Sequence, residues 1–154
     1  MELTQSLAEK YRKSPKRLKN KESLELSGEF KIIGEELISD EYGDIFKLDM
    51  RRNKIELKIL NCNTRSNDCF ILARLDVNDR EHKNPDGTIV GRTHLHLYKE
   101  GFNGRFAYDP KEFGFEDLNN ISSLITQFTK FCNINKECIK IQEVLNDTKF
   151  EKNN

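Results

Sequence analysis

The three histidines of this chain, His82, His94 and His96, fall within fifteen residues of one another. Imidazole is the side chain whose ordinary pKa lies closest to neutral pH, and it is also a common metal ligand. Two of the three belong to the segment 93–98, Thr-His-Leu-His-Leu-Tyr, whose alternation of polar and apolar residues predicts a half-buried strand. Side chains two residues apart on a strand point the same way, so we expect His94, His96 and Tyr98 on one face. This strand is the candidate site.

Two charged residues of an earlier apolar segment could reach the same face. Residues 69–77 predict a strand near the centre of a sheet, with Arg74 and Asp76 on a common face. If this strand pairs with the histidine strand, the pairing register decides whether the two charged side chains lie beside the histidines. His82 lies in the connection between the two strands and could fold over the same face.

Such a cluster would have the parts needed for acid–base catalysis at a phosphodiester. The reaction needs a base for the attacking water or hydroxyl, an acid for the leaving oxygen and a cation for the charged transition state. Two of the three histidines would transfer protons, Arg74 would hold the phosphate and Tyr98 would orient or donate. We therefore predict a small hydrolase that acts on a phosphodiester, with RNA as the expected substrate and no cofactor. The expected catalytic residues are His82, His94, His96, Arg74 and Tyr98.

A divalent metal site is an alternative use of the same strand. The spacing His94-x-His96-x-x-x-Glu100 is that of the first cupin motif, which supplies metal ligands. His94, His96 and Glu100 would then be the ligands, with His82 or water in the fourth position. The motif's closing glycine is missing, and no later histidine can serve as the ligand of a second cupin motif. A complete cupin is therefore not indicated.

A basic segment near the N-terminus supports a third, non-catalytic alternative. Residues 10–21 hold seven Lys or Arg and no acidic residue, although the chain has 26 basic and 26 acidic residues and no net charge. This segment could contact phosphate groups, and the protein would then bind RNA or inhibit a nucleic-acid-handling protein complex. A solvated linker explains the same charges. The expected binding residues are Asp76, Asn84, Lys13, Lys16 and Arg17.

The elements that must position these residues indicate an α+β fold. Alternating segments predict a mostly antiparallel sheet of five or six strands, and helical spacing predicts a packed C-terminal helix and a short N-terminal helix. The N-terminal helix is expected over residues 2–13, and the C-terminal helix over 118–131 with Asp117 as its cap. The expected strands are 30–38, 45–51, 54–59, 69–77, 93–98 and 105–108, while 139–145 fits either a strand or a short helix.

Turn signals separate the expected strands and indicate how the chain is divided. The segments 45–51 and 54–59 predict a hairpin across a two-residue turn, and 61–67 predicts a polar loop. Residues 84–87, Asn-Pro-Asp-Gly, are a type I turn signature just before the histidine strand. Three parts follow: an N-terminal helix and basic arm (1–27), a single α+β domain (28–146) and a flexible tail (147–154).

The composition indicates a polar globular protein, with 36% hydrophobic and 34% charged residues. No apolar run approaches the roughly 18 residues that a membrane helix requires, and the N-terminus does not have the pattern of a secretory signal. We expect a cytoplasmic protein without membrane association. The four cysteines lack Cys-x-x-Cys spacing, so free thiols are expected.

The histidine region resembles a family of small proteins. The runs 82–87, His-Lys-Asn-Pro-Asp-Gly, and 94–101, His-Leu-His-Leu-Tyr-Lys-Glu-Gly, are similar to a pattern in an uncharacterised family of bacterial and phage-borne proteins. Residues 131–134, Phe-Cys-Asn-Ile, are similar to a further pattern in the same group. The resemblance implies a shared site rather than a named activity. It also suggests a setting in mobile elements, phage defence or counter-defence.

Overall fold

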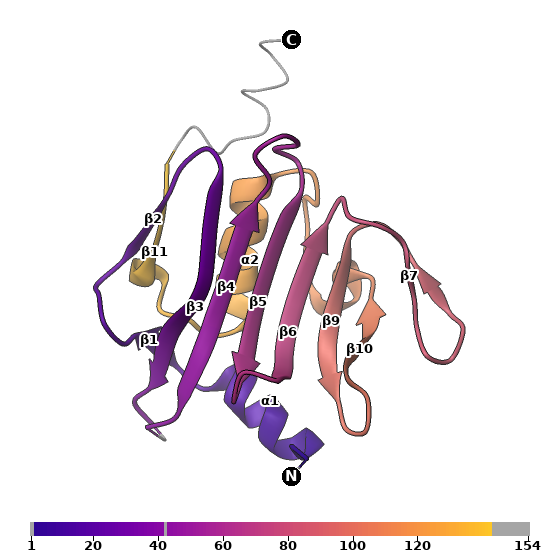
Figure 1. Ribbon diagram of the computed structural model, residues 1–154, viewed down its shortest axis with the longest axis horizontal. Helices are drawn as coiled ribbons and strands as arrows, with labels where there is room; N and C mark the ends of the chain where they lie inside the picture. The colour runs from indigo at the N-terminus through magenta and orange to yellow at the C-terminus, as the bar shows by residue number, and fades with distance from the viewer. Residues whose placement is uncertain (1, 42, 143–154) are drawn as a thin grey trace.

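A seven-stranded antiparallel sheet forms the body of the molecule (Figure 1). The computed structural model describes residues 2–41 and 43–142, so the expected tail at 147–154 lies outside the described residues. The α+β class is confirmed, but the main sheet has more than the five or six strands expected. In spatial order the strands are β1 (Lys16–Leu18), β3 (Phe30–Ser39), β4 (Ile45–Arg52), β5 (Leu60–Ser66), β6 (Phe70–Val77), β9 (His94–Lys99) and β10 (Asn103–Tyr108).

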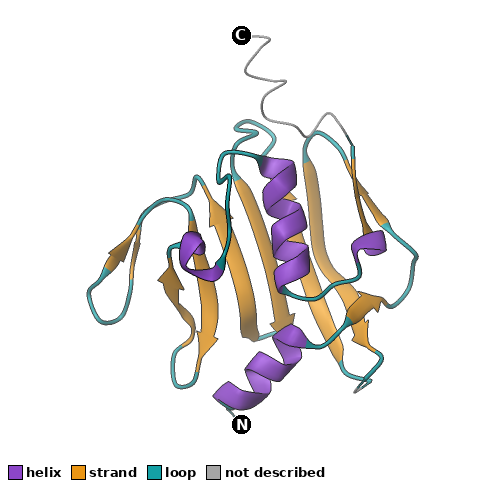
Figure 2. Ribbon diagram, turned by 180° about the vertical axis from the view of Figure 1, so that it is seen from behind, coloured by secondary structure: helices purple, strands orange, loops and turns teal. Residues whose placement is uncertain are grey.

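Two small strand pairs flank this sheet, and two α-helices cover one of its faces. Seen from behind, α1 and α2 both lie over the same face of the sheet (Figure 2), and among the described residues no helix lies on the opposite face. The pairs are β2 (Leu24–Leu26) with β11 (Ile139–Ile141), parallel, and β7 (His82–Lys83) with β8 (Ile89–Val90), antiparallel. The helices are α1 (Gln5–Lys13), α2 (Ile121–Phe131) and two 3₁₀ turns, Pro110–Phe113 and Lys136–Cys138.

Helix α2 buries an apolar stripe against the middle of the sheet. Its residues Ile121, Leu124, Ile125 and Phe128 are buried, as helical spacing of three and four residues requires. The helix begins later than expected. Asn120 caps it by accepting the Ser123 N–H at 3.0 Å, and the sequence expectation that Asp117 is the cap is wrong.

Strand β5, which pairs with β4, is formed by the polar segment that was expected to be a loop (61–67). Residues 54–59 form the connection instead, and Ile55 within it is 96% exposed. The predicted hairpin over 45–51 and 54–59 is therefore wrong. Strand β5 alternates as well, but its inward side chains include Cys62, Thr64 and Ser66 rather than large apolar groups. Small polar residues fit there because the sheet lies close beneath α2, where the Thr64 hydroxyl contacts the Cys132 thiol at 3.6 Å.

The basic segment is part of the folded structure rather than a free arm, since residues 10–13 end α1 and residues 16–18 form β1. Strand β1 pairs with β3, so the N-terminal part of the chain and the rest share one sheet. Lys16 is buried, and its ammonium donates to three backbone carbonyls at the ends of the helices, those of Arg12, Ser14 and Cys132, at 2.8 to 2.9 Å. Burial lowers the pKa of Lys16 to about 8. This residue joins α1 to the end of α2 and is not available to a phosphate.

A bulge in β3 starts a polar network on the helix-free face. Gly34 adopts a φ of +69°, where the pairing of β3 with β4 shifts register. The Gly34 N–H then donates to Asp49 at 2.8 Å. Arg65 donates to the same carboxylate from β5 at 2.8 Å, and Asn63 does so at 3.1 Å. Burial would raise the pKa of Asp49, but these hydrogen bonds and the Arg65 charge hold it below its ordinary value.

This network predicts a pH-dependent contribution to stability. Because the pKa of Asp49 is lower in the folded than in the unfolded protein, its stabilisation is present above the unfolded value of about 3.9 and is lost as pH falls through the folded value. We expect Asp49→Asn to lower the free energy of unfolding by about 1 to 2 kcal/mol at pH 7. The difference should shrink towards zero in acid, as measured by urea denaturation at several pH values.

Asp40→Asn is the matched control for this variant. Asp40 pairs with Arg17 at 3.1 Å in an exposed position, so its loss should change stability by less than about 0.5 kcal/mol. A constant difference between Asp49→Asn and the wild type across the pH range would contradict the assigned role.

Candidate functional site

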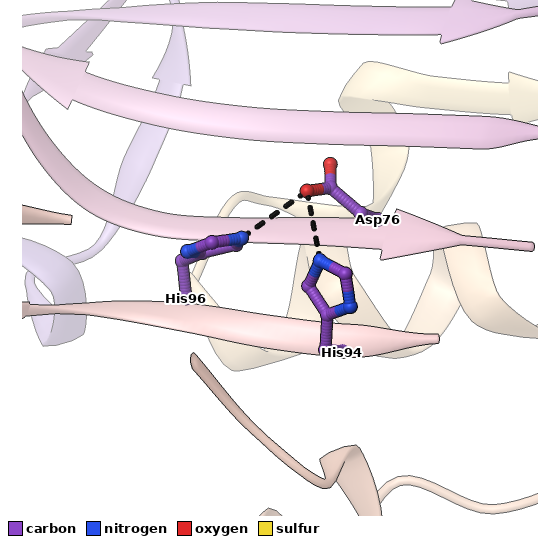
Figure 3. Close-up of side chains that lie close together, drawn as sticks. All are labelled: Asp76, His94 and His96. Atoms are coloured by element: carbon purple, nitrogen blue, oxygen red, sulfur yellow. Dashed lines mark ion pairs between the residues drawn. The ribbon is translucent and has the colours of Figure 1, made fainter. Parts of the chain in front are cut away.

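The register between β6 and β9 brings the charged and imidazole side chains together. Asp76 lies opposite His94, and Arg74 lies opposite His96. The alternate residues of the same strands, Leu75 among them, belong to the hydrophobic core on the helix side. The cluster therefore occupies the helix-free face, and Figure 3 shows both imidazoles turned towards the Asp76 carboxylate.

Asp76 is the centre of the cluster. Its Oδ2 lies 3.3 Å from Nε2 of His94 and 3.2 Å from Nε2 of His96. Arg74 donates to the same oxygen from Nη2 at 3.0 Å, and Asn61 of β5 donates to Oδ1 at 2.8 Å. Asp76 and both histidines are almost fully buried, whereas the Arg74 side chain is 37% exposed. A buried carboxylate of this kind requires such partners, because an unpaired charge is costly to remove from water.

A backbone carbonyl fixes the orientation of each imidazole. Nδ1 of His94 lies 2.7 Å from the Gly91 carbonyl oxygen, and Nδ1 of His96 lies 2.8 Å from that of Gly104. A carbonyl oxygen only accepts, so both Nδ1 atoms carry a proton. In the neutral rings the lone pair is then on Nε2, which faces Asp76 in both cases.

A bulge in β10 supplies two carbonyls that accept hydrogen bonds from histidines. The pairing of β10 with β9 shifts between Asn103 and Phe106, and Gly104 and Arg105 lie in the shifted segment. The Gly104 carbonyl accepts from His96, and the Arg105 carbonyl accepts from Nε2 of His82 at 2.8 Å. Bulges often redirect groups in this way beside functional sites. One local irregularity therefore positions two of the three histidines.

His82 covers the other two imidazoles from β7. Its ring centroid lies 5.5 Å from that of His94 and 4.7 Å from that of His96, and it is the most exposed of the three. The adjacent turn forms as expected, with the Gly87 N–H donating to the Asn84 carbonyl at 2.8 Å. The Asn84 amide also bonds the backbone of Ala107 in β10, donating at 3.0 Å and accepting at 2.8 Å. The β7–β8 hairpin is thereby attached to the sheet.

The surroundings shift the pKa values of Asp76, His94 and His96 in different directions. Burial raises the pKa of Asp76, but the Nε2–H groups that His94 and His96 offer when they are protonated, together with the Arg74 charge, outweigh it and hold that pKa well below its ordinary value. Burial also opposes the charged form of His94, yet the bonds to Asp76 and Gly91 leave its pKa raised. The pKa of His96 is lowered, chiefly by burial and further by Arg74. The two imidazoles thus differ in their tendency to hold a second proton.

Tyr98 and Glu100 have their contacts at the N-terminal segment rather than in the cluster. The Tyr98 hydroxyl donates to the Leu3 carbonyl, and its ring packs edge-on against Phe70. Glu100 accepts the Gln5 N–H at 2.7 Å. Among the described residues, the group that could hold a metal ion is Asp76, His94 and His96, so Asp76 rather than Glu100 lies with the two histidines.

The expected phosphate-binding residues do not gather at the site either. Strand β1 is five strands away from β9, or about 24 Å at roughly 4.8 Å per strand. Lys13 is exposed at the end of α1, Lys16 is buried, and Arg17 pairs with Asp40. Asn84 is buried with its amide bonded to the backbone, so its role is structural.

Three groups of the site were not anticipated, namely Asn61, Gly91 and Gly104. Asn61 fell in the segment that was expected to be a loop, although alternation over 60–66 could have revealed it. The two glycines act through carbonyl oxygens, which the residue types do not indicate.

Comparison with known proteins places the chain in a family. Residues 3–134 match the model of DUF6978, a family of unknown function. The chain belongs to this family. The resemblance to an uncharacterised family is confirmed to that extent, and the matched range contains the whole cluster. No curated protein and no solved structure matches the chain.

Within the described residues, none of the helices is long and apolar enough to cross a membrane.

The Gly104 position predicts a steric effect on the site. A Cβ added there would lie 2.8 Å from Cβ of Ile71, so Gly104→Ala must displace β10 from β6. We expect a loss of about 1 to 3 kcal/mol in the free energy of unfolding, measured with urea. Gly91→Ala is the matched control, because nothing lies within 4 Å of its added Cβ. Equal stabilities of the two variants would contradict this packing.

The two carbonyl contacts predict the tautomers of the buried histidines. In alkaline buffer with a chelator, where the rings are neutral, long-range ¹H–¹⁵N spectra should show the proton on Nδ1 in both His94 and His96. Spectra of His94→Ala and His96→Ala serve to assign the signals. An Nε2–H tautomer in either ring would contradict the described geometry.

Proposed function

We propose that this protein hydrolyses a phosphodiester, with RNA as the substrate. The observation that carries the proposal is the placement of the half-exposed Arg74 guanidinium beside three packed imidazoles on the helix-free face. A guanidinium pairs well with a phosphate, and an imidazole exchanges protons near neutral pH. An open sheet face can accommodate a polymer.

The members of the cluster differ in burial, and the roles that we propose for them differ accordingly. His94 and His96 are 3% and 2% exposed, so a polymer would contact Arg74 and His82 first. Nε2 of His82 donates to Arg105, which leaves Nδ1 to accept or return a proton. Arg74 would hold a phosphate oxygen and stabilise the charge that develops in the transition state. Water would attack phosphorus while Nδ1 of His82 takes its proton, the bond to the leaving oxygen would break, and His82 would return that proton to the leaving oxygen.

RNA cleavage tests this proposal. Mixed-sequence RNA is incubated with the wild type, Arg74→Ala and His82→Ala, and the products are separated by length. We expect either substitution to lower the cleavage rate by about 100-fold or more, the usual contribution of a general acid or base or of a transition-state cation. Lys130→Ala is the matched control, because it removes an exposed cation from α2 on the opposite face.

Two results would overturn the proposal. One is the absence of cleavage by the wild type of both RNA and a simple diester such as bis(p-nitrophenyl) phosphate. The other is cleavage that survives undiminished in Arg74→Ala. Retention of RNA without cleavage would instead favour a non-catalytic binding protein.

A further inference from the structure

We propose that Asp76, His94 and His96 form a binding site for a divalent transition metal, with zinc as the best-matched ion. Each side chain offers one ligand atom, and these atoms lie within 4.8 Å of one another in a buried position. The inference concerns ion binding alone and does not depend on the proposed hydrolysis.

The spacing of the ligand atoms suits a tetrahedral ion. Two atoms that each lie about 2.0 to 2.1 Å from a zinc ion are about 3.3 to 3.4 Å apart at the tetrahedral angle. The distances from Asp76 Oδ2 to the two Nε2 atoms are 3.3 Å and 3.2 Å. An ion could therefore enter without a large movement of the strands.

The proton positions favour coordination through these same atoms. The Gly91 and Gly104 carbonyls accept from Nδ1 of His94 and His96, which leaves both Nε2 lone pairs directed at the Asp76 carboxylate. Metal-bound histidines commonly donate their other ring N–H to a carbonyl in this way. Asp76 is supported likewise, since Asn61 donates to its second oxygen. All three ligands are thus held from outside the site.

The types of ligand atom indicate which ions this site would bind. Two imidazoles and one carboxylate match the sites of zinc and other first-row divalent metals, whereas calcium and magnesium prefer oxygen ligands. Three protein ligands also leave at least one position for water or another oxygen, which is typical of catalytic rather than structural zinc.

Arg74 competes with the ion for the same space. Its Nη2 lies 3.0 Å from both His96 Nε2 and Asp76 Oδ2, so the guanidinium takes the place of a cation between these atoms. The Arg74 side chain is 37% exposed and can turn outwards into solvent when an ion enters. The site should therefore bind metal more tightly once this charge is removed.

Direct titration with zinc tests the site. The full chain is stripped with a chelator and titrated with ZnCl₂ by calorimetry, and the bound metal is counted by elemental analysis. We expect one ion per chain. Asp76→Asn and His96→Gln should weaken binding by about 100-fold or more, beyond the usual effect of an outer-shell partner. Arg74→Ala should bind about tenfold more tightly, because a neighbouring positive charge is removed.

Glu100→Gln is the matched control, since it removes the carboxylate of the ligand set expected from spacing alone. Its affinity should equal that of the wild type. If a ligand variant fails to fold, cobalt added to the wild type should give tetrahedral absorption bands and shift the ring signals of His94 and His96. Absence of zinc and cobalt binding to the wild type would overturn the inference, as would unchanged affinity in a folded Asp76→Asn variant.

The outcomes for metal and for hydrolysis are separable. Zinc binding without RNA cleavage would support the metal site and overturn the hydrolase proposal. Cleavage at full rate by a chain that binds no zinc would support the hydrolase proposal and overturn the metal site.

Discussion

The pairing register of β5, β6 and β9 determines what this face of the protein can do. It aligns Asn61, Asp76 and His94 in one row across three strands, and it sets Arg74 beside His96. A shift of one residue would turn every one of these side chains to the other face. The register is fixed on the helix side, where Cys62, Leu75 and Leu95 are fully buried in the hydrophobic core. The core thus determines the chemistry of the opposite face.

The buried Asp76 carboxylate depends on its polar neighbours, because an unpaired charge is costly to remove from water. Asp76 accepts hydrogen bonds from Asn61 of β5 and Arg74 of β6, and each imidazole that faces it is bonded on its other side to a backbone carbonyl. Groups held at both ends lose little further freedom when a ligand binds, which is the basis of preorganisation. Arg74 is the exception, because it is bonded at the site yet partly exposed. It is the member of the cluster that can move.

The sequence predicted much of the site because strand periodicity carries that information. Alternation placed His94 and His96 on one face, and the Asn-Pro-Asp-Gly signature located the turn that follows His82. Alternation could not supply the register, which depends on burial against α2. It also misplaced β5, since the inward Thr64 and Ser66 do not look like core residues.

Other features lay beyond any pattern in the chain. The carbonyls that orient the imidazoles depend on the β10 bulge, which exists only after β10 pairs with β9. The close approach of Gly104 to Ile71 likewise joins residues that are 33 positions apart. Lys16 was expected among the binding residues of a basic arm, but its ammonium is buried against three carbonyls from segments that only the fold brings together.

Side chains of β7 and of the turn that follows it also cover the outer edge of β10. His82 and Asn84, two residues apart, bond the Arg105 carbonyl and both polar backbone groups of Ala107, which are the groups that a further strand would pair with. An unpaired edge is where sheets of separate molecules join and aggregate. The opposite edge, β1, is only three residues long. A histidine of the candidate site and its neighbouring asparagine therefore also protect the protein from association through its sheet edge.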